Sequence, residues 1–244
     1  MSLLRAQQIE FEKTGQLPGT TSEEKKTVLI VGGGSIGKQH TIELLNASLE
    51  EHLQVLKGFD SVNRKIEYKK NVLIPEFRGY VSRLEDSGEI HPLLGYYLVW
   101  LLDAGEIDEA LPYGLWCVEN GIDLPERFQS KLPTFFVGEV CKWAEVQLDE
   151  DLSADPYISL LFEAVTENDW DIVDKVSAAL YRAMGFQAEQ SGDLEAAAGY
   201  LETAFKMGAQ VKTRLGDIKK LLAKNAAAAA EAAEADTAEA PATT

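Results

Sequence analysis

LLDAGEIDEALPYGLWCVENGI, residues 101–122, predicts the turn and the second helix of a helical hairpin. A related stretch, AEQSGDLEAAAGYLETAFKMGA, follows at residues 188–209. The acid after the first glycine of each stretch, Glu106 or Asp193, is expected to cap the helix that follows. The two stretches agree in residue kind at six positions: Gly105 with Gly192, Ile107 with Leu194, Ala110 with Ala197, Tyr113 with Tyr200, Cys117 with Ala204, and Gly121 with Gly208.

The small residues Ala110 and Ala197 allow two helices to approach closely in each copy. The pattern resembles the tetratricopeptide repeat, in which each unit is a pair of helices. Two copies 87 residues apart do not make the regular array of that family, whose period is about 34 residues. The sequence therefore predicts an all-α fold with tetratricopeptide-like hairpins, preceded by an N-terminal helical region.

Composition divides the chain into four segments. The first residues have no sustained apolar period, and the last are rich in Ala and Glu. Apolar spacing predicts helices over 41–57, 62–74 and 77–84, with Pro75 ending or kinking the second of them. The expected segments are a flexible arm (1–40), a helical region for DNA binding and oligomerisation (41–86), a tetratricopeptide-like domain (88–224) and a disordered tail (225–244).

The formal net charge is −17, yet basic residues cluster locally. Residues 81–205 hold 25 acidic and 6 basic side chains, whereas residues 57–78 hold 6 basic and 3 acidic ones. Such a cluster is either an ordinary solvated helix face or a surface that binds phosphate. The candidate DNA-binding residues are Arg64, Lys65, Lys69, Lys70 and Arg78, and an alternative set is Lys212, Arg214, Lys219 and Lys220.

The helix expected over 41–57 carries one apolar stripe close to a heptad seam. A seam of this kind suits packing between helices, within a chain or between chains. The stripe is the candidate oligomerisation surface and consists of Ile42, Leu45, Leu49, Leu53 and Leu56.

The glycine-rich stretch VLIVGGGSIGKQH, residues 28–40, fits two nucleotide-binding patterns. Gly32, Gly34 and Gly37 have the spacing of a dinucleotide loop, and Gly32, Gly37 and Lys38 have that of a P-loop. Gln39 stands where a P-loop needs Ser or Thr, and no alternation of strands and helices follows to build a parallel sheet. A nucleotide-binding protein using Gly32–Lys38 stays an alternative to a glycine-rich join.

No catalytic or metal-binding constellation is evident in the sequence. His40, His52 and His91 lie far apart, and no Cys-x-x-Cys occurs. Acidic residues cluster at 149–155 and 169–174, where helix starts favour them in any case. We therefore predict no cofactor and no metal.

The two cysteines, Cys117 and Cys141, fall in apolar helical patterns and are expected to be reduced core thiols. No apolar run approaches the roughly 20 residues that span a bilayer. The expected location is a cytoplasm, without membrane association.

Four motifs together resemble the small terminase subunit of tailed bacteriophages, in the gpM-type branch of temperate myophages. They occur in this order: RKIEYKKNVLIP (64–75), LVWLLDAGEIDEAL (98–111), LPTFFVGEV (132–140) and GDLEAAAGYLETA (192–204). The resemblance covers about residues 40–224. In this chain the arm has no strongly basic run and the tail is acidic, which departs from a simple clamping of DNA by the tail.

The resemblance implies a role in genome cutting and packaging into the procapsid, in the host bacterial cytoplasm. Its implied partners are double-stranded viral DNA, the large ATPase and nuclease subunit of terminase, and further copies of the chain in a ring. The branch is described as the endonuclease subunit, but the residues show no active site, so we attribute cutting to the complete terminase. A helical-repeat adaptor that binds a protein partner stays an alternative.

Overall fold

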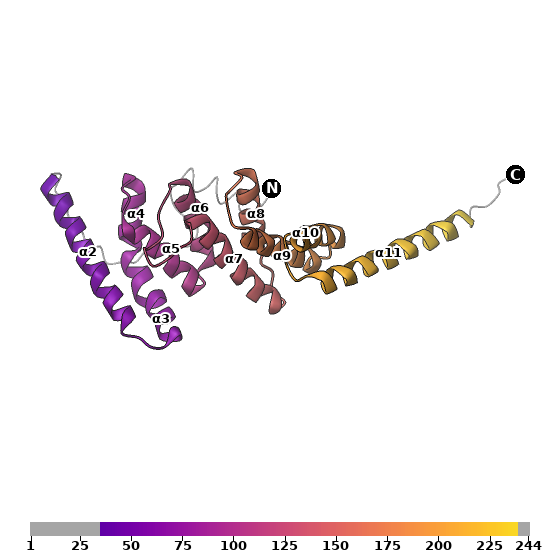
Figure 1. Cartoon of the computed structure of the whole chain (residues 1–244), viewed down its shortest axis with the longest axis horizontal. Helices are drawn as coiled ribbons and strands as arrows, with labels where there is room; N and C mark the ends of the chain where they lie inside the picture. Colours follow the sequence, from indigo (N-terminus) through magenta and orange to yellow (C-terminus); the bar gives the residue numbers. More distant parts are fainter. Residues whose placement is uncertain (1–34, 239–244) are drawn as a thin grey trace. The chain divides into compact units, whose positions relative to one another are not determined.

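The computed structural model describes residues 35–238, and this part of the chain is helical, without a strand (Figure 1). The all-α prediction is confirmed over these residues. No helix in the described range is long and apolar enough to cross a membrane. The elements are α2 (Ser35–Lys57), α3 (Val62–Tyr68), the π-helical turn η1 (Lys69–Leu73), α4 (Ile74–Ser87), α5 (Pro92–Ala104), α6 (Ile107–Glu119), α7 (Leu132–Asp149), α8 (Tyr157–Glu167), α9 (Asp174–Gln190), α10 (Leu194–Lys206) and α11 (Lys212–Ala238).

The described residues form two compact units that divide within α2, between Ser48 and Leu49. The second unit begins at Leu49 and contains α3 and every later helix. The segment boundaries expected near residues 40, 87 and 225 stay predictions. At the C-terminus, α11 continues to Ala238, into the stretch predicted to be disordered, because alanine has the highest helix propensity.

Both predicted hairpins are present. Gly105 and Gly192 adopt the left-handed backbone, with φ of 71° and 85°, and each ends a helix. The predicted cap is correct for Asp193, whose carboxylate accepts a hydrogen bond from the Ala196 amide at 2.9 Å. It is wrong for Glu106, whose carboxylate makes no capping bond and instead pairs with Lys70. The likeness to tetratricopeptide repeats stays a prediction.

The region 62–87 is one continuous helical run and differs from the prediction. Pro75 was expected to end or kink a helix, but it lies in the first turn of α4. The π-helical turn before it, closed by the bond from the Ile74 amide to the Lys69 carbonyl, widens the backbone. The wider turn gives the proline ring room, and the chain stays helical through it.

The core of the second unit lies between α4 and α5 and continues along the later helices. Phe77 and Trp100 are fully buried and their rings lie 5.5 Å apart. Further along, α9 packs against α10 and α10 against α11. Ala197, Leu201 and Val211 are buried in that second cluster. Burial of Leu215 and Ile218 in the same cluster therefore fixes the start of α11 to the hairpin before it.

Candidate nucleic-acid interface

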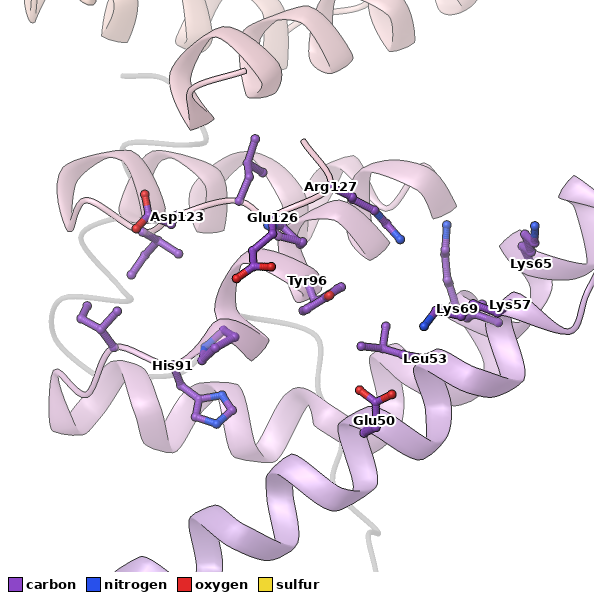
Figure 2. Close-up of a pocket in the computed structure, with 16 residues that line it drawn as sticks. Glu50, Leu53, Lys57, Lys65, Lys69, His91, Tyr96, Asp123, Glu126 and Arg127 are labelled. Atoms are coloured by element: carbon purple, nitrogen blue, oxygen red, sulfur yellow. The ribbon is translucent and has the colours of Figure 1, made fainter. Parts of the chain in front are cut away.

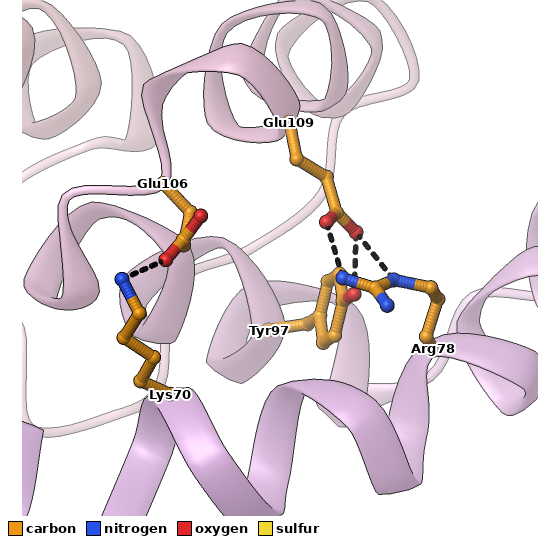
Figure 3. Close-up of polar contacts among 5 residues, drawn as sticks. All are labelled: Lys70, Arg78, Tyr97, Glu106 and Glu109. Atoms are coloured by element: carbon orange, nitrogen blue, oxygen red, sulfur yellow. Dashed lines mark hydrogen bonds and ion pairs between the residues drawn. The ribbon is translucent and has the colours of Figure 1, made fainter. Parts of the chain in front are cut away.

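The first candidate basic cluster is partly neutralised by ion pairs. Lys69 pairs with Asp103, Lys70 with Glu106 at 2.6 Å, and Arg78 with Glu109 at 2.7 Å. The three carboxylates come from the end of α5 and the start of α6. These pairs fasten the basic helical run to the first hairpin, as Figure 3 shows for Lys70 and Arg78.

The Arg78 pair is the most elaborate of the three. Arg78 donates to both oxygens of Glu109, through Nε at 3.2 Å and Nη2 at 2.7 Å. The Tyr97 hydroxyl donates to the same carboxylate at 2.6 Å (Figure 3). The Glu109 carboxylate raises the pKa of Arg78, and burial together with Glu109 raises the pKa of Tyr97. Arg78 therefore has a structural partner that a DNA phosphate would have to displace.

Arg64 and Lys65 differ from these residues, because neither forms an ion pair with any described residue. The Arg64 guanidinium lies over the Phe59 ring, 4.8 Å from its centre, and remains exposed. Lys65 lines a pocket. The structure thus separates the five candidates into three paired cations and two unpaired ones.

That pocket has a volume of about 720 Å³ and lies within the second unit (Figure 2). It is formed by the C-terminal part of α2, the α3–η1 run, the start of α5, and the loop that follows α6. Its lining residues are Glu50, Leu53, Leu56, Lys57, Lys65, Lys69, Ile90, His91, Pro92, Tyr96, Ile122, Asp123, Leu124, Pro125, Glu126 and Arg127.

Close packing holds the loop of residues 121–127 at the pocket. Gly95 lies so near this loop that an added Cβ would be 2.2 Å from the carbonyl oxygen of Asp123. The buried Ile122 donates its amide to the Cys117 carbonyl at 2.9 Å. His91, which also lines the pocket, caps α5, because its Nδ1 accepts from the Leu93 amide at 3.1 Å. Burial lowers the pKa of His91, which favours the neutral ring that this bond requires.

Charge is unevenly distributed around the pocket. Lys57, Lys65 and Lys69 lie together at one end, and His91 and Asp123 lie toward the other (Figure 2). Lys57 and Arg127, like Lys65, form no ion pair with a described residue. The Arg127 guanidinium lies 5.9 Å from the Tyr96 ring centre and 4.9 Å from that of Phe128.

Sequence reasoning missed Arg127 and Tyr96 as site residues. Arg127 is one of two cations, with Lys131, in the loop between Pro125 and Pro133, inside the strongly acidic stretch 81–205. That contrast is the only sequence signal that pointed to it. Its proximity to Tyr96 and to Lys57 depends on the tertiary fold.

The alternative basic cluster, on α11, is also largely paired. Arg214 pairs with Glu189 at 2.7 Å, Lys219 with Glu202 at 2.6 Å, and Lys220 with Asp217 at 3.0 Å. The hydrogen bond from Lys219 lowers the pKa of Glu202. Lys212 has no such pair among the described residues and borders a shallow hollow of about 410 Å³.

The predicted oligomerisation stripe is mostly covered within the protomer. Leu45 and Leu49 are 4% and 5% exposed, and Leu56 is buried. Ile42 and Leu53 are partly exposed, and Leu53 lines the pocket. The exposed apolar side chains of α2 lie outside the stripe and are Leu44, at 54%, and Val55, at 39%. The stripe's part in assembly stays a prediction.

The other candidates from the sequence were the glycine-rich stretch, the possible metal ligands and the two cysteines. Of the glycine-rich stretch, Gly32 to Gly34 lie outside the described residues, and α2 begins at Ser35. Between residues 39 and 230, no three His, Cys, Asp or Glu side chains come together as metal ligands. Cys117 and Cys141 are buried free thiols, as predicted, and burial raises the pKa of each to about 12.

Known phage proteins are similar to this chain. A family model described as phage small terminase subunit matches residues 46–175. The "Probable terminase, endonuclease subunit" of Haemophilus phage HP1 (strain HP1c1) is 26% identical over 137 residues, which cover 55% of this chain and 48% of that protein. The "Terminase, endonuclease subunit" of Escherichia phage P2 is 23% identical over 199 residues, covering 78% and 80%. The match thus spans about half the length of the first relative. No solved structure matches the chain.

Proposed function

The chain belongs to the phage small terminase subunit family, whose role is in genome packaging, and on that premise we propose that it binds double-stranded viral DNA and recruits the large terminase subunit. The relatives' names include the word terminase, which supports a packaging role for this chain. We place this activity in the host bacterial cytoplasm.

One observation supports DNA binding most directly. Lys57, Lys65 and Arg127, which have no carboxylate partner in the described part of the chain, converge on one pocket, with Arg64 exposed on the adjoining α3. The chain carries a formal net charge of −17, so most of its surface repels DNA. Unpaired cations gathered in one place bind phosphates by releasing counterions.

The paired candidates have a smaller part in this proposal. Lys69, Lys70 and Arg78 would have to exchange Asp103, Glu106 and Glu109 for phosphates. Each exchange breaks an existing ion pair, which offsets the gain from the new contact. We therefore propose Arg64 and Lys65 as the main contacts of the five, with Lys69, Lys70 and Arg78 adding to them at low salt.

A ring of subunits would multiply a modest contribution from each copy. Each phosphate contact lowers the logarithm of affinity by roughly 0.9 per log unit of salt, so a few contacts per subunit produce a steep salt dependence. We propose that the assembled ring presents the Arg64 and Lys65 side chains along one track. The large subunit would then be recruited to DNA already held there.

The test is charge reversal with a matched control. We expect Arg64→Glu with Lys65→Glu to weaken binding to every duplex sequence and to flatten the salt slope, without loss of helical circular dichroism. Lys175→Glu with Lys206→Glu changes the net charge equally at two exposed cations elsewhere. It should weaken binding much less.

Three other results would overturn parts of this proposal. If both double variants weaken binding equally, the effect is one of net charge. If Lys212→Glu with Lys219→Glu alone abolishes binding, the interface lies on α11. Charge reversal there is preferable to removal of α11, because Leu215 and Ile218 are buried in the core. If the wild-type protein has no salt-sensitive affinity for DNA, the alternative function, an adaptor that binds a protein partner, is favoured.

The relatives are named endonuclease subunits, and we propose that cutting belongs to the complete terminase. Among the described residues no three metal-ligating side chains converge, which supports this view. We expect the purified chain with magnesium or manganese to leave DNA intact in a nicking assay on supercoiled plasmid. Cutting that disappears in an Asp149→Asn, Asp151→Asn variant would contradict the proposal and assign a nuclease site to this chain.

A further inference from the structure

The pocket is lined by other side chains besides the cations that would bind the backbone of a duplex. Phosphates on the outside of a double helix are met by exposed Lys and Arg side chains. This pocket adds an aromatic ring, an apolar lining and carboxylates to its cations. We propose that it takes one unpaired nucleotide of a DNA strand. The inference rests on the proposed DNA-binding function and assigns a second kind of contact to the same region.

The size of the pocket suits a ligand of this class. Its volume of about 720 Å³ falls within the roughly 300–1,000 Å³ of small-molecule sites in proteins. Leu53, Leu124 and the buried Pro125 supply apolar lining. A base, sugar and phosphate therefore fit with contacts to both apolar and charged walls.

The phosphate belongs at the lysine end. Lys57 and Lys65 are the unpaired cations there, and Lys69 stands beside them with Asp103 as its partner (Figure 2). The Lys69 side chain is only 12% exposed and is already paired with Asp103. It is therefore less available to a phosphate than Lys57 and Lys65 are. Two free ammonium groups leave net positive charge at this end, and that charge favours a phosphodiester.

Tyr96 supplies the surface on which a base would stack. It lies in the middle of the pocket, with the Arg127 guanidinium on one side (Figure 2). The Trp100 ring, with its centre 6.1 Å away, packs against Tyr96 from the buried side of α5. Base stacking on an aromatic ring tolerates any sequence, because every base has a π face, and an arginine adds a cation–π contribution.

The carboxylates favour a nucleotide over an acidic peptide. Asp123 and Glu126 are exposed and form no ion pair within residues 39–230, and Glu50 lies on the α2 wall. A carboxylate accepts hydrogen bonds from the amino group of a base, as in acidic readout of cytosine. The same three carboxylates would repel an acidic peptide segment. An unpaired base with its phosphate matches both ends of the pocket.

The experiment compares a short blunt duplex, the same duplex with a single-stranded extension, and a free nucleoside monophosphate. We expect the wild-type protein to bind the extended duplex roughly tenfold more tightly than the blunt one, as one stacked base contributes. Tyr96→Leu should abolish that preference by weakening the binding of the extended duplex much more than that of the blunt one, whereas Tyr96→Phe should retain it. Thermal melting checks that both variants fold.

A second measurement needs no variant. An oligonucleotide with 5-iodouracil in its single-stranded extension, irradiated with the wild-type protein, should form an adduct that peptide mapping places at Tyr96. Adducts only on α11, or equal affinity for the two duplexes, would overturn the inference. Tight binding of the free monophosphate without a preference for the extended duplex would also overturn it, as would displacement from the pocket by an acidic peptide. Absence of blunt-duplex binding would instead count against the proposed function.

Discussion

At the scale of single residues, Glu85 on α4 makes stability depend on pH. Burial, with added repulsion from Asp86 and Glu109, raises the pKa of Glu85 from its ordinary 4.5 to about 7. A raised pKa in the folded state means that the native protein binds the proton more tightly than the unfolded chain does. This contribution to stability is complete below pH 4.5 and is lost as pH rises through 7.

We expect the free energy of unfolding of the wild-type protein to fall between pH 5 and pH 8 by on the order of 1 to 2 kcal/mol from this group. Glu85→Gln should reduce that fall, because the amide does not titrate. Urea unfolding at the two pH values measures the difference, with Glu163→Gln as an exposed control. Identical pH dependence in wild type and Glu85→Gln would refute the assignment.

Single residues also show which features can be predicted from the sequence and which depend on the tertiary fold. Gly105 and Gly192 were predictable as turn residues, because a left-handed backbone is a local requirement. The role of Glu106 was not predictable, because its partner Lys70 lies far away in the sequence. Likewise, Lys69 and Asp103 are 34 positions apart, and Arg78 and Glu109 are 31 apart. Local charge counting finds the cations, but only the fold decides which of them are paired.

At the scale of elements, the Arg78–Glu109 pair adds a polar contact to the packing of α4 against the first hairpin. Its two hydrogen bonds and the third from Tyr97 converge on one carboxylate. The Lys70–Glu106 pair has similar exposure but a single contact. Half-exposed pairs usually contribute less than about 1 kcal/mol, and bidentate geometry is the recognised exception.

A double-mutant cycle tests this difference. We expect Arg78→Met with Glu109→Gln to give a coupling energy of about 1 kcal/mol in urea unfolding, and Lys70→Met with Glu106→Gln to give about half of that or less. Equal coupling energies would show that the bidentate geometry and Tyr97 add nothing. The result also bears on DNA binding, since a strong Arg78–Glu109 pair is a poor phosphate contact.

The elements themselves were largely predictable from apolar spacing. The helical run 62–87 is the exception, because proline was taken as a helix breaker. A π-helical turn at Lys69–Leu73 accommodates Pro75, and no local sequence rule identifies such a turn. The pocket was equally unpredictable, because its walls come from α2, η1, α5 and a loop that are distant in sequence.

At the scale of the whole molecule, the prediction to be tested is assembly of subunits through α2. The stripe of Ile42, Leu45, Leu49, Leu53 and Leu56 was predicted to join subunits, but three of its five members are buried within the protomer. Introducing aspartate at Leu49 would therefore damage the fold as well as any interface. The exposed apolar side chains Leu44 and Val55 lie eleven positions apart, about three helical turns, so they project from one side of α2.

This arrangement gives a sharper test of oligomerisation by α2. We expect Leu44→Ser with Val55→Ser to lower the native mass to that of a monomer while helical circular dichroism is kept, because both side chains are exposed in the protomer. Leu221→Ser, which removes an exposed leucine from α11, is the control and should leave the mass unchanged. Leu49→Asp should reduce both native mass and thermal stability, because the side chain is only 5% exposed. If the Leu44→Ser, Val55→Ser variant keeps the native mass of the wild type, this face of α2 does not form a subunit contact.

The same variant also tests how assembly affects DNA binding. If its monomers still bind duplex DNA, but with a shallower salt slope, assembly multiplies contacts that are already present in each subunit.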